Sequence, residues 1–284
     1  MIMKRSKHRI KLLFIAAFIF SFSIKAQQFR PNTEIGVLLG TSYYLGDLNT
    51  THFNSSSFAA GLVIRKNIDK RFSYKAELLY LNIAADDREN STDTIAIDRG
   101  LHFRSAVYEL SAQIEFNFLP YDPGNPLHTW TPFIYTGISL FHFNPQAENK
   151  EGEWVDLQPL GTEGQGTAIV GSKEYSLTQV AIPLGGGVKI AVNPSFNIIL
   201  EYGIRKTFTD YLDDVSTDFV GSSPAAASND YPVEMSSQSE LMSDPNGTHS
   251  RGVQRGDPTK DDWYSFAGIT LSFKLNNNTK GCDY

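Results

Sequence analysis

The sequence predicts an all-β protein, an eight-stranded antiparallel up-and-down transmembrane β-barrel with short periplasmic turns and long extracellular loops. Three observations support this fold class. Eight segments alternate apolar and polar residues, the connections between them alternate in length, and aromatic residues gather near the ends of the apolar faces. Alternate side chains of a strand point to opposite faces. Short turns at one end and long loops at the other are typical of outer-membrane barrels.

The segment 196–207 shows the alternation clearly. Its apolar face contains Phe196, Ile198, Leu200, Tyr202 and Ile204, and the opposite face contains Asn197, Ile199, Glu201, Gly203, Arg205 and Thr207. The other seven predicted strands, in chain order, are 33–44, 58–66, 71–82, 104–118, 131–143, 176–191 and 263–275. Pro183 within one of them predicts a bulge or a strand end, because proline cannot donate to a β-ladder.

The predicted connections differ strongly in length. Segments 67–70 and 192–195 are tight turns and 119–130 is of medium length, whereas 46–57, 83–103, 144–175 and 209–262 are long and polar. The even number of strands puts both chain ends on the short-turn side. No helical period is found between these strands, so the connections are predicted to lack helices.

Alternation alone does not decide which face of the barrel points outward. A soluble lipocalin-like barrel would bury the apolar face, whereas a membrane barrel exposes it to lipid. The aromatic residues near the strand ends, the strand lengths and the unequal loops favour the membrane barrel. The polar face would then line the lumen, and its predicted charges are Lys75, Glu77, Glu109, Glu115, Lys189, Glu201 and Arg205.

The predicted lumen should be closed. An eight-stranded barrel is just wide enough for its own side chains, so we expect a plugged interior and no general diffusion pore. Glu201 and Arg205 lie four residues apart, about 13 Å along a strand, and cannot pair with each other. Each is expected to need a partner on another strand, because an unpaired buried charge is costly.

The N-terminus predicts export. Basic residues precede an apolar stretch over 12–24, which indicates a cleaved signal peptide at 1–26, with an uncleaved anchor as the alternative. The barrel domain would then span 27–275 and a short periplasmic tail 276–284. The formal net charge of −6 becomes more negative without the basic leader, which argues against nucleic-acid binding. Cys282 is the single cysteine, so an internal disulfide is excluded.

Several motifs admit a functional reading beside a structural one. Asp210, Asp213 and Asp214 could bind calcium, but without EF-hand spacing a solvated loop is favoured. The tripeptide 255–257, Arg-Gly-Asp, could be adhesive or a chance occurrence. Within a predicted strand, the glycines 185–187 indicate a bend or close packing.

The sequence predicts no enzyme, because no catalytic constellation is recognisable. Ser139 and His142 could suggest a lipid-modifying hydrolase, but they should lie on opposite faces of one strand. The six histidines show no metal-binding spacing. Accordingly no catalytic residue, metal, cofactor or small-molecule substrate is predicted.

Four segments carry a family resemblance: EIGVLLGTSYYLGDLN at 34–49, TPFIYTGISLFHFNP at 131–145, LEYGIRKTFTDYLDDVS at 200–216 and RGDPTKDDWYSFAGITLSFKL at 255–275. Together they resemble the PorG-type outer-membrane barrels of the type IX secretion system of Bacteroidota. The resemblance implies a non-enzymatic component of the secretion machinery that docks a periplasmic ring lipoprotein and associated secretion proteins. The alternatives are a generic OmpA-like structural or surface-binding barrel and, less favoured, a lipid-modifying enzyme.

Overall fold

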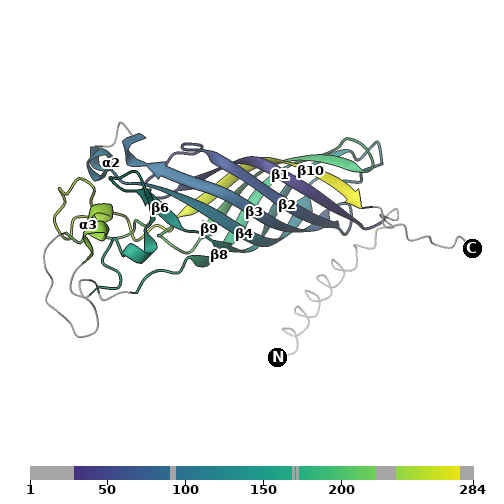
Figure 1. Ribbon diagram of the computed structural model, residues 1–284. Helices are drawn as coiled ribbons and strands as arrows, with labels where there is room; N and C mark the ends of the chain where they lie inside the picture. The colour runs from purple at the N-terminus through teal and green to yellow at the C-terminus, as the bar shows by residue number, and fades with distance from the viewer. Residues whose placement is uncertain (1–28, 90–93, 168–169, 171–172, 222–234, 276–284) are drawn as a thin grey trace, which may run out of the picture. The chain divides into compact units, whose positions relative to one another are not determined.

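The computed structural model describes residues 29–89, 94–167, 170, 173–221 and 235–275 (Figure 1). The described residues from 31 onward belong to one compact unit, and the fold described below is that of this unit. The predicted signal peptide at 1–26, the predicted tail at 276–284 and Cys282 lie outside the described residues.

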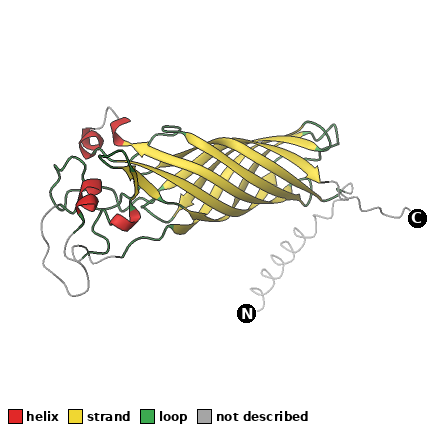
Figure 2. Cartoon of the chain, viewed as in Figure 1, coloured by secondary structure: helices red, strands yellow, loops and turns green. Residues whose placement is uncertain are grey.

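Eight long antiparallel strands close into a barrel, which confirms the predicted fold class (Figure 2). Each strand pairs with its neighbours along the chain; β1 pairs with β10, and the pairing of β3 with β4 completes the ring. The barrel strands are β1 (Asn32–Leu45), β2 (Ser57–Asn67), β3 (Phe72–Asp86), β4 (His102–Asn117), β5 (Trp130–His142), β8 (Thr178–Ala191), β9 (Phe196–Thr207) and β10 (Trp263–Leu275).

The barrel has two unlike ends. Connections 68–71, 118–129 and 192–195 lie at the short-turn end, and 46–56, 87–101, 143–177 and 208–262 lie at the long-loop end (Figure 1). The prediction that the connections lack helices is wrong. The long loops contain η1 (Asp87–Glu89), α2 (Thr94–Arg99), η2 (Gln158–Leu160), α3 (Ser237–Ser243) and the hairpin β6 (Pro145–Glu148) with β7 (Trp154–Asp156).

These helices escaped the sequence pattern because each is only one or two turns long. A helical period needs a window of about 11 residues or more to be visible. Among the described residues, no helix has the length and apolarity of a membrane span. The short helices are held by tertiary contacts and local caps, such as the Ser236 side chain that accepts a hydrogen bond from the Ser239 amide.

The structure also differs from the prediction at the end of β3 and at Pro183. β3 runs to Asp86 rather than ending at 82, because it continues to pair with β4 up to the partners Asp86 and His102. Pro183 makes no bulge: the register between β5 and β8 is the same on either side of it. The ladder with β5 is interrupted there, while Pro183 still faces Arg205 on β9.

The distribution of apolar and charged side chains is the reverse of that in a soluble protein. Its outward face is apolar, with Leu110 exposed by 59% and Ile138 by 63%, whereas Arg65, Lys75 and Arg205 are buried inside. Along β4 and the residue that follows it, outward apolar side chains continue from Tyr108 to Phe118, about 25 Å along the barrel axis for a strand tilted by about 40°. This matches the roughly 25 Å apolar band of transmembrane barrels.

Aromatic pairs lie at both edges of the apolar band. Near the long-loop end, Tyr80 and Tyr108 have ring centroids 5.3 Å apart. Near the short-turn end, the same distance separates Phe72 and Phe116. Aromatic rings prefer the boundary between lipid and water. The outer surface is therefore built to contact lipid over the apolar band.

Candidate functional site: a filled lumen and a buried cap

The seven charged residues predicted to share the polar face are all buried within the barrel. Glu201 is the most exposed of them, at 5%. They are Lys75, Glu77, Glu109, Glu115, Lys189, Glu201 and Arg205. Each of them lies within 4 Å of an oppositely charged group.

Glu115 on β4 is the centre of the first ionic cluster. It accepts hydrogen bonds from Arg65 Nε at 2.7 Å and from Lys189 Nζ at 2.6 Å, and Lys75 Nζ lies 3.8 Å away. Arg65 is on β2 and Lys189 is on β8, and neither strand is a neighbour of β4. β2 and β8 lie on opposite sides of the ring, so the cluster as a whole spans the lumen.

A second cluster binds the two charges of β9. Arg205 contacts Glu109 through two nitrogens, at 2.9 Å (Nε) and 3.0 Å (Nη2), and Tyr264 donates to the same carboxylate at 2.7 Å. Glu201 instead accepts from Lys75 at 3.1 Å, and Lys75 also lies 2.8 Å from Glu77. Glu201 and Arg205 thus have separate partners on the opposite wall.

Glycines on β8 and β9 make room for Tyr135 in this interior. A Cβ atom at Gly185 would lie 2.5 Å from the Tyr135 ring, and one at Gly203 would lie 2.1 Å from its hydroxyl. The ring covers Lys75, whose Nζ is 4.0 Å from the ring centroid. The glycines 185–187 are predicted to mark a bend or close packing, and close packing against Tyr135 explains Gly185.

Two lumen charges are missing from the predicted set. Arg65 is buried beside Glu115, and Glu34 on β1 lies 3.7 Å from Arg65 and accepts a hydrogen bond from Ser272 at 2.9 Å. Both residues have the same strand parity as their inward-facing neighbours, which is the signal that could have found them.

The short-turn end of the lumen is covered by Tyr121. This residue belongs to the 118–129 turn and is buried, and its amide donates to the Lys70 carbonyl at 2.9 Å. Deeper inside, large buried side chains fill the cross-section. Those at most 2% exposed within the barrel strands include Arg65, Lys75, Phe133, Lys189, Arg205, Tyr264 and Phe266.

The purified barrel is therefore expected to conduct no ions at the level of a diffusion channel. Each charged side chain that could line a water path is already held by a partner, and an eight-stranded barrel leaves no spare width. Planar-bilayer recordings should show a flat baseline. Reproducible steps on the nanosiemens scale would contradict a filled lumen.

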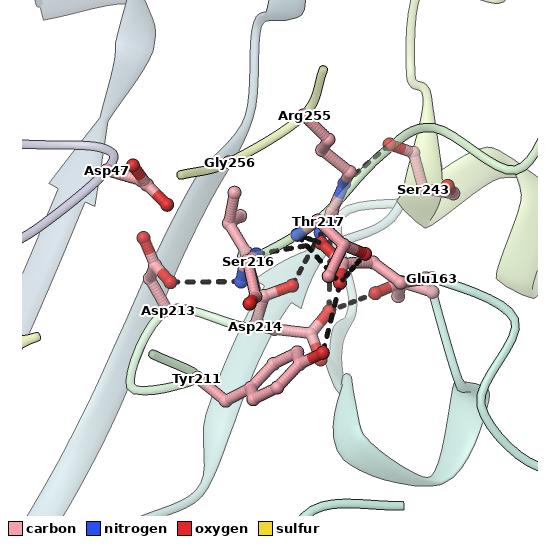
Figure 3. Close-up of polar contacts among 12 residues, drawn as sticks. Asp47, Glu163, Tyr211, Asp213, Asp214, Ser216, Thr217, Ser243, Arg255 and Gly256 are labelled. Atoms are coloured by element: carbon pink, nitrogen blue, oxygen red, sulfur yellow. Dashed lines mark hydrogen bonds and ion pairs between the residues drawn. The ribbon is translucent and has the colours of Figure 1, made fainter. Parts of the chain in front are cut away.

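At the long-loop end, Glu163 joins three parts of the loops into a buried cap (Figure 3). Its carboxylate accepts hydrogen bonds from the amides of Ser216 and Thr217 at 2.8 and 3.0 Å, and from Arg255 Nη1 at 2.9 Å. The Thr217 hydroxyl donates to the same carboxylate at 2.7 Å. One buried carboxylate thus links the 143–177 loop to two segments of the 208–262 loop.

Arg255 is the cation of this cap. It is only 3% exposed, and it also donates to the carbonyls of Asp214 at 2.5 Å and Ser243 at 3.2 Å (Figure 3). A receptor needs an accessible arginine to bind an Arg-Gly-Asp tripeptide. The adhesive reading of 255–257 is therefore wrong for this conformation, and the arginine has a structural role.

Arg99 at the end of α2 ties the remaining loops to the cap. It binds the Asp87 carboxylate at 2.7 and 2.8 Å, and it donates to the carbonyls of Asp47 and Arg255 at 2.9 and 2.7 Å. All four long connections are thereby joined by two buried guanidinium groups.

The run TDYLDDVS at 209–216 lies inside the cap rather than in solvent. Asp214 accepts hydrogen bonds from Thr162 and from Tyr175, the latter at 2.7 Å, and Asp213 accepts from the Val215 amide at 2.9 Å. These donors occupy oxygens that a calcium ion would need. Within the described residues no group of three metal-ligating side chains is assembled. The favoured prediction of a solvated loop is also wrong, because this loop is buried.

A buried acid cluster joins the cap to the top of the barrel. The Tyr44 hydroxyl lies 2.5 Å from Asp213 Oδ2 and 2.8 Å from Asp262 Oδ1. A phenol has one hydrogen to donate, so the second contact requires a protonated carboxyl. Gly46 leaves space for this contact, because a Cβ atom there would lie 1.9 Å from Asp262 Oδ1.

Burial of the acid cluster raises the pKa of Asp213 well above its usual range, and the nearby negative charge of Asp47 adds to the effect. Burial, reinforced by Asp213, likewise raises the pKa of Asp262. A carboxyl whose pKa is higher in the folded state stabilises that state at low pH. The stability is lost as the pH rises through the folded pKa.

Asp213→Asn is therefore expected to protect the cap at pH 8, because a neutral amide replaces the carboxyl that needs an extra proton. Its advantage over the wild type should shrink toward pH 4, close to the ordinary carboxyl value of 3.8. Limited proteolysis of the long loops across this pH range measures the difference. A variant that is cleaved faster than the wild type at pH 8 would contradict the shared proton.

Ser139 and His142 do not form a catalytic pair. Ser139 points inward and donates to the Ala181 carbonyl at 3.3 Å, whereas His142 is exposed on the outer face, with its Nδ1 3.0 Å from the Thr178 hydroxyl. The prediction that the two residues lie on opposite faces is confirmed.

Comparison with known proteins identifies one family model, described as "Domain of unknown function (DUF6089)", which matches residues 9–160. A search of curated proteins found no match. Among solved structures, Ail of Yersinia pestis in complex with the heparin analogue sucrose octasulfate is 7% identical, with a TM-score of 0.39, 86% of this chain covered and 97% of that chain. Neisserial surface protein A is 9% identical, with a TM-score of 0.42 and coverage of 87% of this chain and 99% of that chain. OprG of Pseudomonas aeruginosa is 10% identical, with a TM-score of 0.35 and coverage of 88% of this chain and 99% of that chain.

Proposed function

The chain belongs to the DUF6089 family, and we propose that it is an integral outer-membrane component of a type IX protein secretion machinery. In this proposal the barrel is an anchor, not an enzyme, and it docks a periplasmic ring lipoprotein. The resemblance of four segments to PorG-type barrels supplies the specific machinery.

The filled lumen is the observation that carries the proposal. Glu115, Arg65 and Lys189 cross the interior as a bonded cluster, so the barrel offers no route for a solute or a protein substrate. The surfaces left for interactions are the lipid-facing wall and the two ends of the barrel. A barrel with a blocked interior is suited to anchoring and docking.

The short-turn end offers a surface for a partner. Leu127 at the tip of the 118–129 turn is 84% exposed, and Trp130 and Val192 are exposed nearby at strand ends. The turn is held by the Tyr121 backbone and by an ion pair between Lys70 and Asp122 at 3.7 Å. Exposed apolar residues on an ordered turn are typical of protein interaction sites.

Deletion of the protein should block secretion of type IX cargo, and an affinity-tagged barrel should recover a periplasmic ring lipoprotein from detergent extracts. Leu127→Asp should lower this recovery about tenfold or more, as expected for loss of one buried apolar anchor. Ile95→Asp is the matched control, because Ile95 is 77% exposed at the opposite end. Intact cargo secretion after deletion would refute the proposal.

A second candidate is a surface-binding barrel of the OmpA-like kind. The observation that favours it is a cleft of about 830 Å³ in the cap, lined by α2 and by residues 253–256. Retained secretion after deletion, together with failure to recover any ring lipoprotein, would favour this candidate.

A further inference from the structure

A groove of about 900 Å³ runs along the outer wall at the long-loop end, over the extensions of β3 and β4. We propose that this groove binds the sugar headgroup of an anionic outer-leaflet glycolipid, whose anionic group contacts Arg104. The inference rests on the proposed outer-membrane location and is independent of the secretion role.

The groove has a small-residue floor between two walls. Asn82, Ala84 and Ala106 lie at its base, Phe58 forms one wall, and Trp154 forms the other. The small side chains of the floor therefore leave a shallow trough between the large side chains on either side. The groove lies directly beyond the Tyr80–Tyr108 pair and is continuous with the apolar band.

The height of Arg104 indicates the size of the headgroup. Arg104 lies four residues beyond Tyr108 on β4, about 13 Å along the strand and about 10 Å along the barrel axis. The headgroup layer of an ordinary bilayer is only about 5–8 Å deep on each side. A lipid anchored at the Tyr108 level therefore needs an extended head, such as linked sugars, to reach Arg104.

Arg104 is preorganised to bind an anion. Its guanidinium carbon lies 3.6 Å from the centroid of the Trp154 ring, and its Nε makes one long contact of 3.4 Å with Gln146. Within the described chain, no carboxylate lies within ion-pair distance of it. A stacked guanidinium with free nitrogens suits bidentate binding of a phosphate or carboxylate.

The rest of the groove is suited to sugar hydroxyls rather than to further anions. Arg88 is already bound by Asp86 at 2.5 Å. Glu89 and Glu148 also line the groove, and carboxylates accept hydrogen bonds from hydroxyl groups. One available cation beside several acceptors and aromatic rings matches a singly anchored, hydroxyl-rich head.

Lys206 provides a matched comparison on the other side of the barrel. It lies four residues beyond Tyr202 on β9 and is 4.9 Å from the Trp263 ring. Unlike Arg104, it is paired with Asp261 at 2.6 Å. Each cation thus lies four residues beyond an outward tyrosine and beside a tryptophan, but of the two only Arg104 lacks a carboxylate partner in the described structure.

The test uses the purified full chain in nanodiscs, with lipid A carrying inner-core sugars as the probe and phosphatidylglycerol as the competitor. Arg104→Ala should weaken retention of the probe about tenfold, the effect of losing one charge-assisted contact. Ala84→Trp should weaken it similarly by filling the floor, while Lys206→Ala should leave it unchanged. Heat-modifiable gel migration establishes that each variant is folded.

Retention of the probe by Arg104→Ala and Ala84→Trp at the wild-type level would overturn the proposal. Equal competition by phosphatidylglycerol would overturn it as well. Cell fractionation tests the outer-membrane location separately, and cargo secretion tests the machinery, so failure of either is distinguishable from failure of the groove.

Discussion

Replacing Glu115 with alanine is expected to lower the free energy of unfolding by about 3–5 kcal/mol. The substitution leaves Arg65 and Lys189 buried without their shared carboxylate, and water cannot enter the filled lumen to solvate them. Urea titration of the barrel in phospholipid vesicles, followed by the fluorescence of its three tryptophans, measures the change.

Glu148→Ala is the control for this prediction, because Glu148 is an exposed carboxylate on β6. Its effect should stay within about 0.5 kcal/mol. If Glu115→Ala is as mild as this control, the crossing ion pairs contribute little and the barrel is stabilised by its ladder and its lipid contacts.

Replacing Arg255 with alanine is expected to open the cap without unfolding the barrel. Glu163 would lose its buried cation, and the carbonyls of Asp214 and Ser243 would lose their donor. A local cost of about 2–3 kcal/mol corresponds to proteolysis of the long loops that is about 30- to 150-fold faster. Protease digestion of proteoliposomes, with mass spectrometry of the released fragments, measures this rate.

Lysine at position 255 should not restore protection, because an ammonium cannot reproduce the planar fork that contacts Glu163 and two carbonyls. Lys260→Ala is the control in the same loop, since Lys260 is exposed and its ion pair among the described residues is a surface contact with Asp257. Cleavage of Arg255→Ala at the wild-type rate would mean that the cap is held by other contacts.

The barrel could be predicted from the sequence because the patterns that specify it lie within single strands and single connections. Alternation along each strand put Lys75, Glu115 and Arg205 on one face, and loop lengths separated the two ends. The partners could not be predicted in the same way. Glu115 binds residues on β2 and β8, and which residues meet across the lumen depends on the register of every strand and on ring closure.

The cap was harder to predict for a related reason. Glu163, Arg99 and Arg255 come from three different loops, and no periodic pattern links them. Their polar surroundings in the sequence suggested exposed loops. Burial became favourable only because each charge meets an opposite charge or several backbone groups, which is a property of the assembled tertiary structure.

The polar contacts inside the barrel also bear on how the protein assembles and how long it survives. Arg65 and Glu115 are separated by 50 residues, Lys75 and Glu201 by 126, and Tyr264 and Glu109 by 155. The last two contacts link strands on opposite sides of the ring, so they form once the first and last strands have met and belong to the final stage of folding. Interactions absent from the transition state slow unfolding more than they speed folding. The interior charges should therefore act as a kinetic lock, which sets the lifetime of the inserted barrel rather than its rate of insertion.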